Sequence, residues 1–472
     1  MSAAAAIFNV SLCAFADTTN PSDNQGVFLS LTAFGRSDSL VGIAPAASEG
    51  TVGQEELEYR TLSRPGEVLE TVPGVIVTQH SGGGKANQFF LRGFNLDHGT
   101  DLATSLDGIP LNLPTHAHGQ GYTDLNILIP ELIERVDFRK GNYYADAGDF
   151  ASAGADDIQY VKSLPKNIAQ IEDGSFGYRR GLVASSQHIG NGNLLFAVEL
   201  YHNDGPWAAP DDYIKNNVVA RYSYGNAALG YSLTAMEYSG AWNATDQIAN
   251  RALSEIPHFG LYDSLDPTDG GNSHRDSFSG EWHREDARSS SKVLLYTYYY
   301  DMDLFSNFTY YLNSPQGDQM EQQDKRWVNG AKASQAWFGN MLNCAMENTI
   351  GLQMRSDSIQ NGLFQTIDRE RINKLNYSGA AIPAITTADN VLEQDISPYV
   401  ENKTWWSDTF RTVLGLRADY YHFSVTPTCL PIQEQITRPS PALKRRWYSA
   451  PGTILNITLT GAWVFTAMTA AA

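Results

Sequence analysis

Residues 194–201 read Leu194-Leu195-Phe196-Ala197-Val198-Glu199-Leu200-Tyr201, and this stretch decides the fold. Its even-numbered positions are all large and apolar, whereas its odd-numbered positions include Ala197, Glu199 and Tyr201. Successive side chains of a β-strand point to opposite faces, so the pattern predicts a strand with one consistently apolar face.

The same two-residue alternation recurs along the chain, less cleanly at 304–312 and clearly at 414–421. Between Ile168 and Val425 the sequence predicts about a dozen such segments, with long polar loops at about 241–274 and 313–328. Strands of this kind, joined by long loops on one side and tight turns on the other, indicate an antiparallel transmembrane β-barrel. A soluble β-sandwich or β-helix is the less favoured alternative, because it would show shorter strands and more even turn spacing.

The composition agrees with a membrane barrel and argues against nucleic acid as a partner. The chain has 33 Lys+Arg against 52 Asp+Glu, a formal net charge of -19, so it lacks the basic surface that phosphates require. A cationic or metal-bearing ligand is compatible with this charge. The 24 Tyr and 9 Trp accompany a mean hydropathy of -0.31, as expected where aromatic girdles and polar positions coexist. No run of about 18 apolar residues follows the N-terminus, which excludes helical membrane spans.

The N-terminal region is predicted to be an export signal followed by a leader. Residues 1–16 are weakly apolar and end in Ala14-Phe15-Ala16, the small-x-small form of a signal-peptidase site. Because no basic segment precedes them, a disordered Ala-rich start is the alternative. Residues 17–50 have the Ser, Gly, Ala and Asp content of a flexible leader. The three cysteines, at positions 13, 344 and 429, do not form a disulfide framework.

Residues 51–163 are predicted to form a compact α+β domain. Ser63 is expected to cap a short helix that stops at Pro73-Gly74. Short β-like runs follow at 75–77, 89–91, 102–106, 133–138 and 158–161, and Asp107-Gly108 supplies a turn. Residues 164–427 would then be the partial barrel.

Four ordered motifs in this domain carry a family resemblance. They are Pro65-Gly66-Glu67-Val68-Leu69-Glu70-Thr71-Val72-Pro73-Gly74-Val75, Phe90-Leu91-Arg92-Gly93-Phe94, Asp107-Gly108-Ile109-Pro110 and Ile133-Glu134-Arg135-Val136-Asp137-Phe138-Arg139-Lys140-Gly141. In this order and spacing they resemble the plug motifs of TonB-dependent outer-membrane receptors. The segment after Gly141 departs from the family pattern, which indicates a divergent subfamily. The best match to an energy-coupling box, residues 27–32, is a poor one.

The resemblance implies roles for three plug charges. Arg92, Glu134 and Arg135 match positions where plug charges pair with the barrel wall, and a charge buried in a plugged lumen is costly unless it is paired. The alternative is that Glu134 and Arg135 are simply opposite faces of one strand.

Four histidines, His80, His98, His116 and His118, fall in the plug loops. Because imidazole is the commonest transition-metal ligand, we consider a site for a metal or metal chelate on ligand-facing loops. Solvated loop histidines are the plainer alternative. A zinc hydrolase is not supported, since three convergent ligands and a base cannot be assembled from the sequence.

The segment 428–472 has lost the alternation and is interpreted as an aberrant tail. It contains Arg438-Pro439-Ser440-Pro441 and Lys444-Arg445-Arg446-Trp447. Back-translation of 438–470 in a shifted frame permits two barrel-like strands around a Ser-Pro-Trp turn, so we infer a single-base frameshift near 428–437. An open sheet edge in hydrocarbon leaves backbone groups unsatisfied, so a truncated barrel is expected to be inactive unless a second fragment completes it.

Together these observations predict a receptor and transporter rather than an enzyme. The resemblance implies a monomer in the outer membrane of a Gram-negative bacterium. It also implies active uptake of a ferric siderophore or other metal chelate, coupled to the inner-membrane TonB complex, with no cofactor of its own. A secreted β-rich binding or adhesion protein is the alternative.

Overall fold

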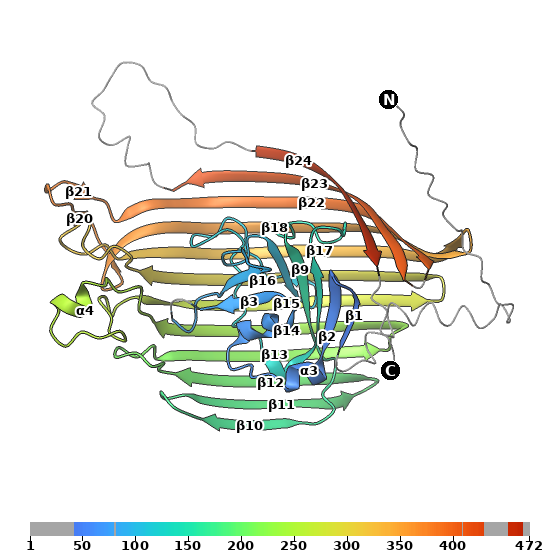
Figure 1. Ribbon diagram of the computed structural model, residues 1–472, viewed down its shortest axis with the longest axis horizontal. Coiled ribbons are helices and arrows are strands. Elements are labelled where there is room, and N and C mark those ends of the chain that lie inside the picture. The colour runs from blue at the N-terminus through green and yellow to red at the C-terminus, as the bar shows by residue number, and fades with distance from the viewer. Residues whose placement is uncertain (1–41, 80–81, 408, 429–451, 466–472) are drawn as a thin grey trace, which may run out of the picture.

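The computed structural model describes residues 42–79, 82–407 and 409–428, together with the backbone of 452–465. A small mixed domain lies against one face of a large antiparallel sheet (Figure 1). Within the described residues, no helix has the length and apolar character needed to cross a membrane.

The small domain, which we call the plug, is built on a six-stranded sheet in the order β1-β2-β8-β9-β6-β7. Its strands are β1 (Gly42–Ala46), β2 (Glu49–Gly53), β6 (Leu102–Leu106), β7 (Ile109–Pro110), β8 (Ile133–Lys140) and β9 (Gly154–Tyr160). All neighbours are antiparallel except β6 and β9. A second sheet contains β3 (Val75–Thr78), β4 (Gln88–Leu91) and β5 (Phe94–Asn95). The helical elements are α3 (Gln54–Glu58) and two 3-10 turns, η2 (Pro65–Thr71) and η3 (Pro130–Leu132).

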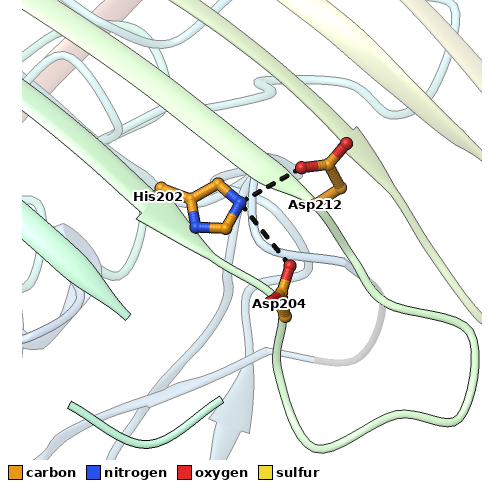
Figure 2. A group of neighbouring side chains, drawn as sticks. All are labelled: His202, Asp204 and Asp212. Atoms are coloured by element: carbon orange, nitrogen blue, oxygen red, sulfur yellow. Dashed lines mark hydrogen bonds and ion pairs between the residues drawn. The ribbon is translucent and has the colours of Figure 1, made fainter. Parts of the chain in front are cut away.

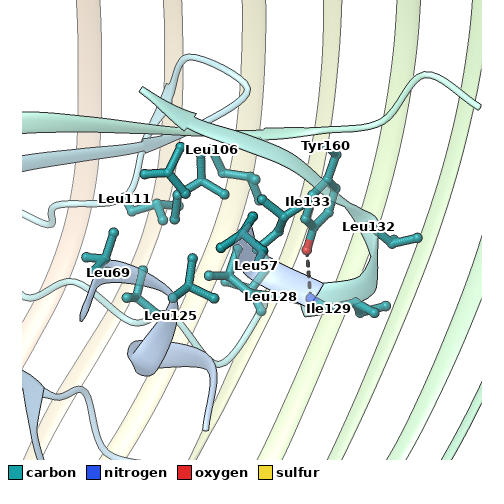
Figure 3. Close-up of a cluster of buried hydrophobic side chains, with 14 of the residues drawn as sticks. Leu57, Leu69, Leu106, Leu111, Leu125, Leu128, Ile129, Leu132, Ile133 and Tyr160 are labelled. Atoms are coloured by element: carbon teal, nitrogen blue, oxygen red, sulfur yellow. Dashed lines mark hydrogen bonds between the residues drawn. The ribbon is translucent and has the colours of Figure 1, made fainter. Parts of the chain in front are cut away.

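The plug has an apolar core of its own (Figure 3). Leu69, Leu106, Leu128 and Ile133, from four separate segments, are each at most 1% exposed. Tyr160 joins them, and its hydroxyl accepts a hydrogen bond from the Ile129 N–H at 2.8 Å. The core therefore fixes the plug sheet and positions the loops that leave it.

The large sheet runs in chain order from β10 to β24, and every neighbouring pair is antiparallel. Its strands are β10 (Ile168–Asp173), β11 (Arg179–Ile189), β12 (Gly192–Asn203), β13 (Tyr213–Gly225), β14 (Leu229–Asn243), β15 (Gly270–Asp286), β16 (Ser289–Ser306), β17 (Met320–Met341), β18 (Cys344–Ile367), β22 (Ile385–Ser407), β23 (Phe410–Pro427) and β24 (Gly452–Phe465). They lengthen from six residues in β10 to 24 in β18. No pairing joins the described parts of β10 and β24, so the sheet is open at both ends.

One end of the sheet has tight turns, at 190–191, 226–228, 287–288 and 342–343, and the other has long connections. The longest of the fully described connections are 244–269, which contains α4 (Ala252–Glu255), and 368–384, which contains β19 (Glu370–Arg371), β20 (Lys374–Leu375) and β21 (Ala381–Ile382). The predicted strand number and the division into tight and long connections are confirmed.

The polarity of the large sheet is inverted relative to a water-soluble protein. On β23, Leu414 and Leu416 are 57% and 45% exposed, while Arg417 and Asp419 on the opposite face are each 4% exposed. Residues 194–201 show the same inverted polarity, since Phe196 and Leu200 are exposed and Glu199 is buried. An apolar outer face over a charged interior suits contact with lipid.

The structure differs from the sequence-based expectations at several boundaries. The plug sheet begins at Gly42, inside the segment 17–50 predicted to be a flexible leader, because β1 and β2 extend the sheet through β8. The helix predicted to be capped by Ser63 is the 3-10 turn η2, whose N-cap is Arg64, and Glu67 accepts hydrogen bonds from the Arg64 N–H and guanidinium. The loop expected at 313–328 ends earlier, since β17 starts at Met320.

The predicted tail 428–472 contains a strand, because β24 pairs with β23 through backbone groups that any sequence supplies. The predicted signal segment 1–16, the coupling-box segment 27–32 and the shift region 429–437 lie outside the described residues.

Candidate functional site: the plug surface that faces the sheet

A loop from Leu111 to Asp124 makes several of the contacts between the plug and the large sheet. Leu113 and Tyr122 form an isolated bridge that closes the loop on itself. The buried side chain of Asn112 holds its base, because Oδ1 accepts the Thr104 N–H at 2.8 Å while Nδ2 donates to the carbonyls of Gly99 at 2.9 Å and Leu102 at 2.8 Å. The loop is therefore fixed by backbone contacts from inside the plug.

Three of the four predicted histidines meet in this region. The Nε2 atoms of His98 and His118 lie 3.1 Å apart. His116 stacks on Tyr122 with ring centroids 4.2 Å apart, and its Nδ1 accepts the His118 N–H at 3.2 Å. His80 lies outside the described residues. The structure thus brings His98 and His118 together, with His116 directed toward an aromatic partner.

The surroundings of His116 and His118 disfavour protonation of these two rings. Burial is the main cause that lowers the pKa of His118 to about 2, with the nearby Lys85 acting in the same direction. Burial also lowers the pKa of His116 well below its usual value, with Arg326 contributing. In the same region, burial raises the pKa of Asp124 to about 6.

Arginines from the large sheet bind the carbonyls of the loop. Arg326 on β17 is fully buried and donates to the carbonyls of Pro114 at 2.7 Å and Thr115 at 3.3 Å. Its charge is balanced by Asp324 at 2.6 Å and Asp357 at 3.1 Å. The sheet therefore holds the loop through charge-assisted hydrogen bonds.

The predicted plug charges contact other plug residues. The Arg135 guanidinium lies 3.1 Å from Asp137 and 3.4 Å from Glu134, and it donates to Gln159 at 2.6 Å. Arg92 lies in an exposed turn with a φ of 54°. Pairing of Arg92, Glu134 and Arg135 with a barrel wall stays a prediction, because none of their described contacts reaches the large sheet.

Different plug acids make the ion pairs with the large sheet. Glu131 in η3 binds Arg180 of β11 through two hydrogen bonds of 2.6 and 2.8 Å. Glu49 pairs with Arg411 of β23, and Asp107 pairs with Arg221 of β13. Burial opposes ionisation of Glu49, but Arg411 and the Tyr144 hydroxyl hold the pKa of Glu49 below its usual value.

Sequence reasoning missed these three acids for identifiable reasons. Asp107 was noted only as a turn residue, and Glu131 lies just before the Ile133–Gly141 motif. Glu49 fell in the predicted leader. No signal in the sequence alone showed which cations they would meet.

A charged cavity of about 410 Å³ separates the plug from strands β16, β17, β18, β22 and β23. Its walls include Arg139, Asp146, Lys292, Lys332, Arg355 and Arg417. Charged side chains of both signs therefore line the space between the plug and these strands.

One further group lies at the long-loop end of the sheet (Figure 2). His202 Nε2 is 3.1 Å from Asp212 and 3.5 Å from Asp204, and its Nδ1 contacts the Gly177 carbonyl at 2.8 Å. All three side chains are partly exposed, with Asp212 at 62%. A protonated imidazole between two carboxylates accounts for this arrangement.

The fold and the contacts together define a class of protein. In this class an α+β plug is held by ion pairs against the charged face of an up-and-down barrel sheet. Residues 44–155 match the family model described as TonB-dependent Receptor Plug Domain. This segment therefore matches the plug domain of TonB-dependent receptors, as the motifs predicted, and the large sheet shares the fold of solved receptors.

Solved structures of such receptors share this fold. The ferric citrate transporter FecA in the unliganded form aligns with a TM-score of 0.69 at 12% identity, covering 90% of this chain and 61% of that one. The ferric-catecholate import receptor Fiu from K12 E. coli in its closed form gives 0.65 at 13% identity, covering 89% and 63%. The copper transporter OprC gives 0.62 at 16% identity, covering 89% and 60%. The chain therefore spans about three fifths of the length of these proteins.

Proposed function

We propose that this chain is the plug and part of the barrel of an outer-membrane receptor that takes up a scarce nutrient. The observation that carries the proposal is the inverted polarity of the large sheet. Arg417 and Asp419 are buried against the plug while Leu414 and Leu416 are exposed on the opposite face. A sheet of this polarity fits lipid outside and a filled lumen inside. It does not fit a secreted adhesion protein, which would expose the apolar face to water.

The cargo that fits best is a metal chelate such as a ferric siderophore. The formal net charge of -19 and the polar cavity beside the plug favour a hydrophilic or metal-bearing ligand over an apolar one. FecA, Fiu and OprC are described as proteins for ferric citrate, ferric catecholate and copper, which supports a metal-bearing cargo for this chain.

Transport would require coupling to the inner-membrane TonB complex and a closed wall around the plug. The unpaired edges of β10 and β24 would each leave backbone groups unsatisfied in hydrocarbon. We therefore propose that this chain alone does not transport, and that activity needs strands that join these two edges.

Three measurements test the proposal. Membrane fractionation should place the chain in the outer membrane, and a completed receptor should show heat-modifiable mobility on gels. Cells that carry the completed receptor should accumulate iron from labelled ferric citrate or ferric catecholates, and cells without TonB should not. Recovery of the chain as a soluble, detergent-indifferent protein would overturn the membrane assignment. Equal accumulation with and without TonB would overturn the coupled transport.

A further inference from the structure

The geometry points to a binding site for a late first-row transition-metal ion, such as Zn²⁺, between the Nε2 atoms of His98 and His118. The inference deepens the proposed function, because it names the chemistry by which the plug would contact a metal-bearing cargo. It rests on that function for its biological meaning, but the binding itself is measurable on purified protein.

The hydrogen-bond partners fix the tautomers of both rings. His98 Nδ1 lies 3.0 Å from the carbonyl oxygen of Asn87, which only accepts, so this Nδ1 carries the proton. His118 Nδ1 lies 2.8 Å from Gln322 Oε1. The Gln322 amide is oriented by its Nε2, which donates to the Ala117 carbonyl at 3.0 Å. Thus His118 Nδ1 is also the protonated nitrogen.

It follows that each neutral ring directs the lone pair of Nε2 toward the other ring across 3.1 Å. Two facing lone pairs repel unless a proton or a metal ion lies between them. A proton would place an imidazolium in a buried site, since the His98 side chain is only 4% exposed. A metal ion instead accepts both lone pairs in bonds that repay its desolvation.

The spacing also suits a metal ion. Nitrogens bound to tetrahedral Zn²⁺ at about 2.0–2.1 Å lie about 3.3 Å apart, close to the separation of the two Nε2 atoms. Asp97 Oδ1 lies 3.7 Å from His98 Nε2 and its side chain is 53% exposed, but the carboxylate does not form a three-ligand group with both imidazoles. Two imidazoles favour Zn²⁺ or Cu²⁺ over Mg²⁺ or Ca²⁺, and they leave positions for water or for donors of the cargo.

Two neighbours of the pair have other roles. His116 is not assigned as a ligand: its Nδ1 accepts the His118 N–H and its ring is stacked on Tyr122, while its Nε2 is buried with no hydrogen-bond partner among the described residues. Lys85 is buried near His118 and disfavours positive charge there. Removal of the Lys85 charge should therefore tighten metal binding, so one variant is expected to bind the metal more strongly than the parent.

The experiment is calorimetric titration of the purified chain with Zn²⁺ in detergent, with every protein carrying His202→Gln so that the exposed group in Figure 2 does not contribute. We expect one ion per chain, binding at least 100-fold weaker in His98→Gln and in His118→Gln, and tighter binding in Lys85→Met. His188→Gln, which removes an exposed histidine from β11, is the matched control and should leave the affinity unchanged.

X-ray absorption of the zinc-loaded protein gives a second readout that does not depend on variants, and it should show two imidazole nitrogens in the first shell. Absence of Zn²⁺ binding, an affinity in either histidine variant equal to that of the parent, or a coordination shell without imidazole would overturn the site. The outcomes also separate this site from the proposed function. Zinc binding without chelate uptake would support the metal site and overturn the proposed transport. Chelate uptake without zinc binding would support the proposed transport and overturn the metal site.

Discussion

Replacement of Arg326 by Met should loosen the plug loop from the sheet. Met has a similar length and fills much of the same space, but it cannot donate hydrogen bonds. The change removes two hydrogen bonds to the carbonyls of Pro114 and Thr115. It also leaves the fully buried Asp324 without the cation it pairs with at 2.6 Å, whereas Asp357 keeps Arg355 at 2.7 Å.

The expected cost follows from this burial. Removing one partner of a buried ion pair destabilises by about 3–5 kcal/mol, because the remaining charge is left uncompensated. At about 1.4 kcal/mol for each factor of ten, local opening of the loop should become about 150- to 3,500-fold more frequent.

Hydrogen exchange with mass spectrometry would measure this opening. The relevant amides are those of Leu113, which donates to the Tyr122 carbonyl, and Gly121, which donates to the Leu113 carbonyl. Lys325→Met is the control on the same strand. Lys325 is 36% exposed and lies 3.5 Å from Asp301, so its loss should cost at most about 1 kcal/mol. Exchange in Arg326→Met that rises less than tenfold, or no more than in Lys325→Met, would refute the idea that the sheet holds the loop through this side chain.

Three further predictions concern the plug. Burial raises the pKa of Asp156 to about 7, so the folded state binds more protons than the unfolded state between about pH 4 and 7, and its stability falls as pH rises through that range. Asp156→Asn should remove this loss, so in denaturant titrations the free energy of unfolding of the variant should exceed that of the parent by about 3–4 kcal/mol at pH 8 and by little at pH 4. The same dependence of stability on pH in both proteins would contradict the prediction. Asn112→Ala should cost about 3 kcal/mol in guanidinium unfolding, because three backbone groups lose their buried partner, and an unchanged midpoint would exclude the anchoring role. Gly148→Ala should lower the melting temperature more than Gly93→Ala does. Both glycines have a positive φ, but only at Gly148 would the new Cβ lie 2.5 Å from Arg417 Nη2. Equal decreases in melting temperature would show that backbone strain alone decides the effect.

The sequence predicted the large sheet well because the governing signal is local. Alternation at 194–201 and 414–421 requires only that neighbouring side chains face opposite sides, and the burial of Glu199 and Arg417 against the exposure of Phe196 and Leu416 follows that rule. The plug motifs were likewise sufficient to recognise the domain. The start of the plug was missed, since β1 and β2 are short strands that depend on pairing with β8.

The contacts between plug and sheet could not be predicted in the same way. Glu131 and Arg180 are separated by 49 residues and Glu49 and Arg411 by 362, so nothing in the local pattern connects them. Arg135 instead pairs locally, because Glu134 and Asp137 on its own strand lie close to its guanidinium. The proximity of His98 and His118 depends on the bridge between Leu113 and Tyr122, which fixes the loop that presents His118.

The unequal strand lengths have a consequence for the outer surface. About 9–11 residues of a tilted strand cross the hydrocarbon. β10 has six residues, whereas β18 has 24, so in the proposed receptor more than half of β18 would extend beyond the lipid. At about 3.3 Å per residue this excess is roughly 40 Å of strand. An approaching molecule would therefore first touch a high rim formed by β17, β18 and β22, while the side near β10 stays low and close to the headgroups.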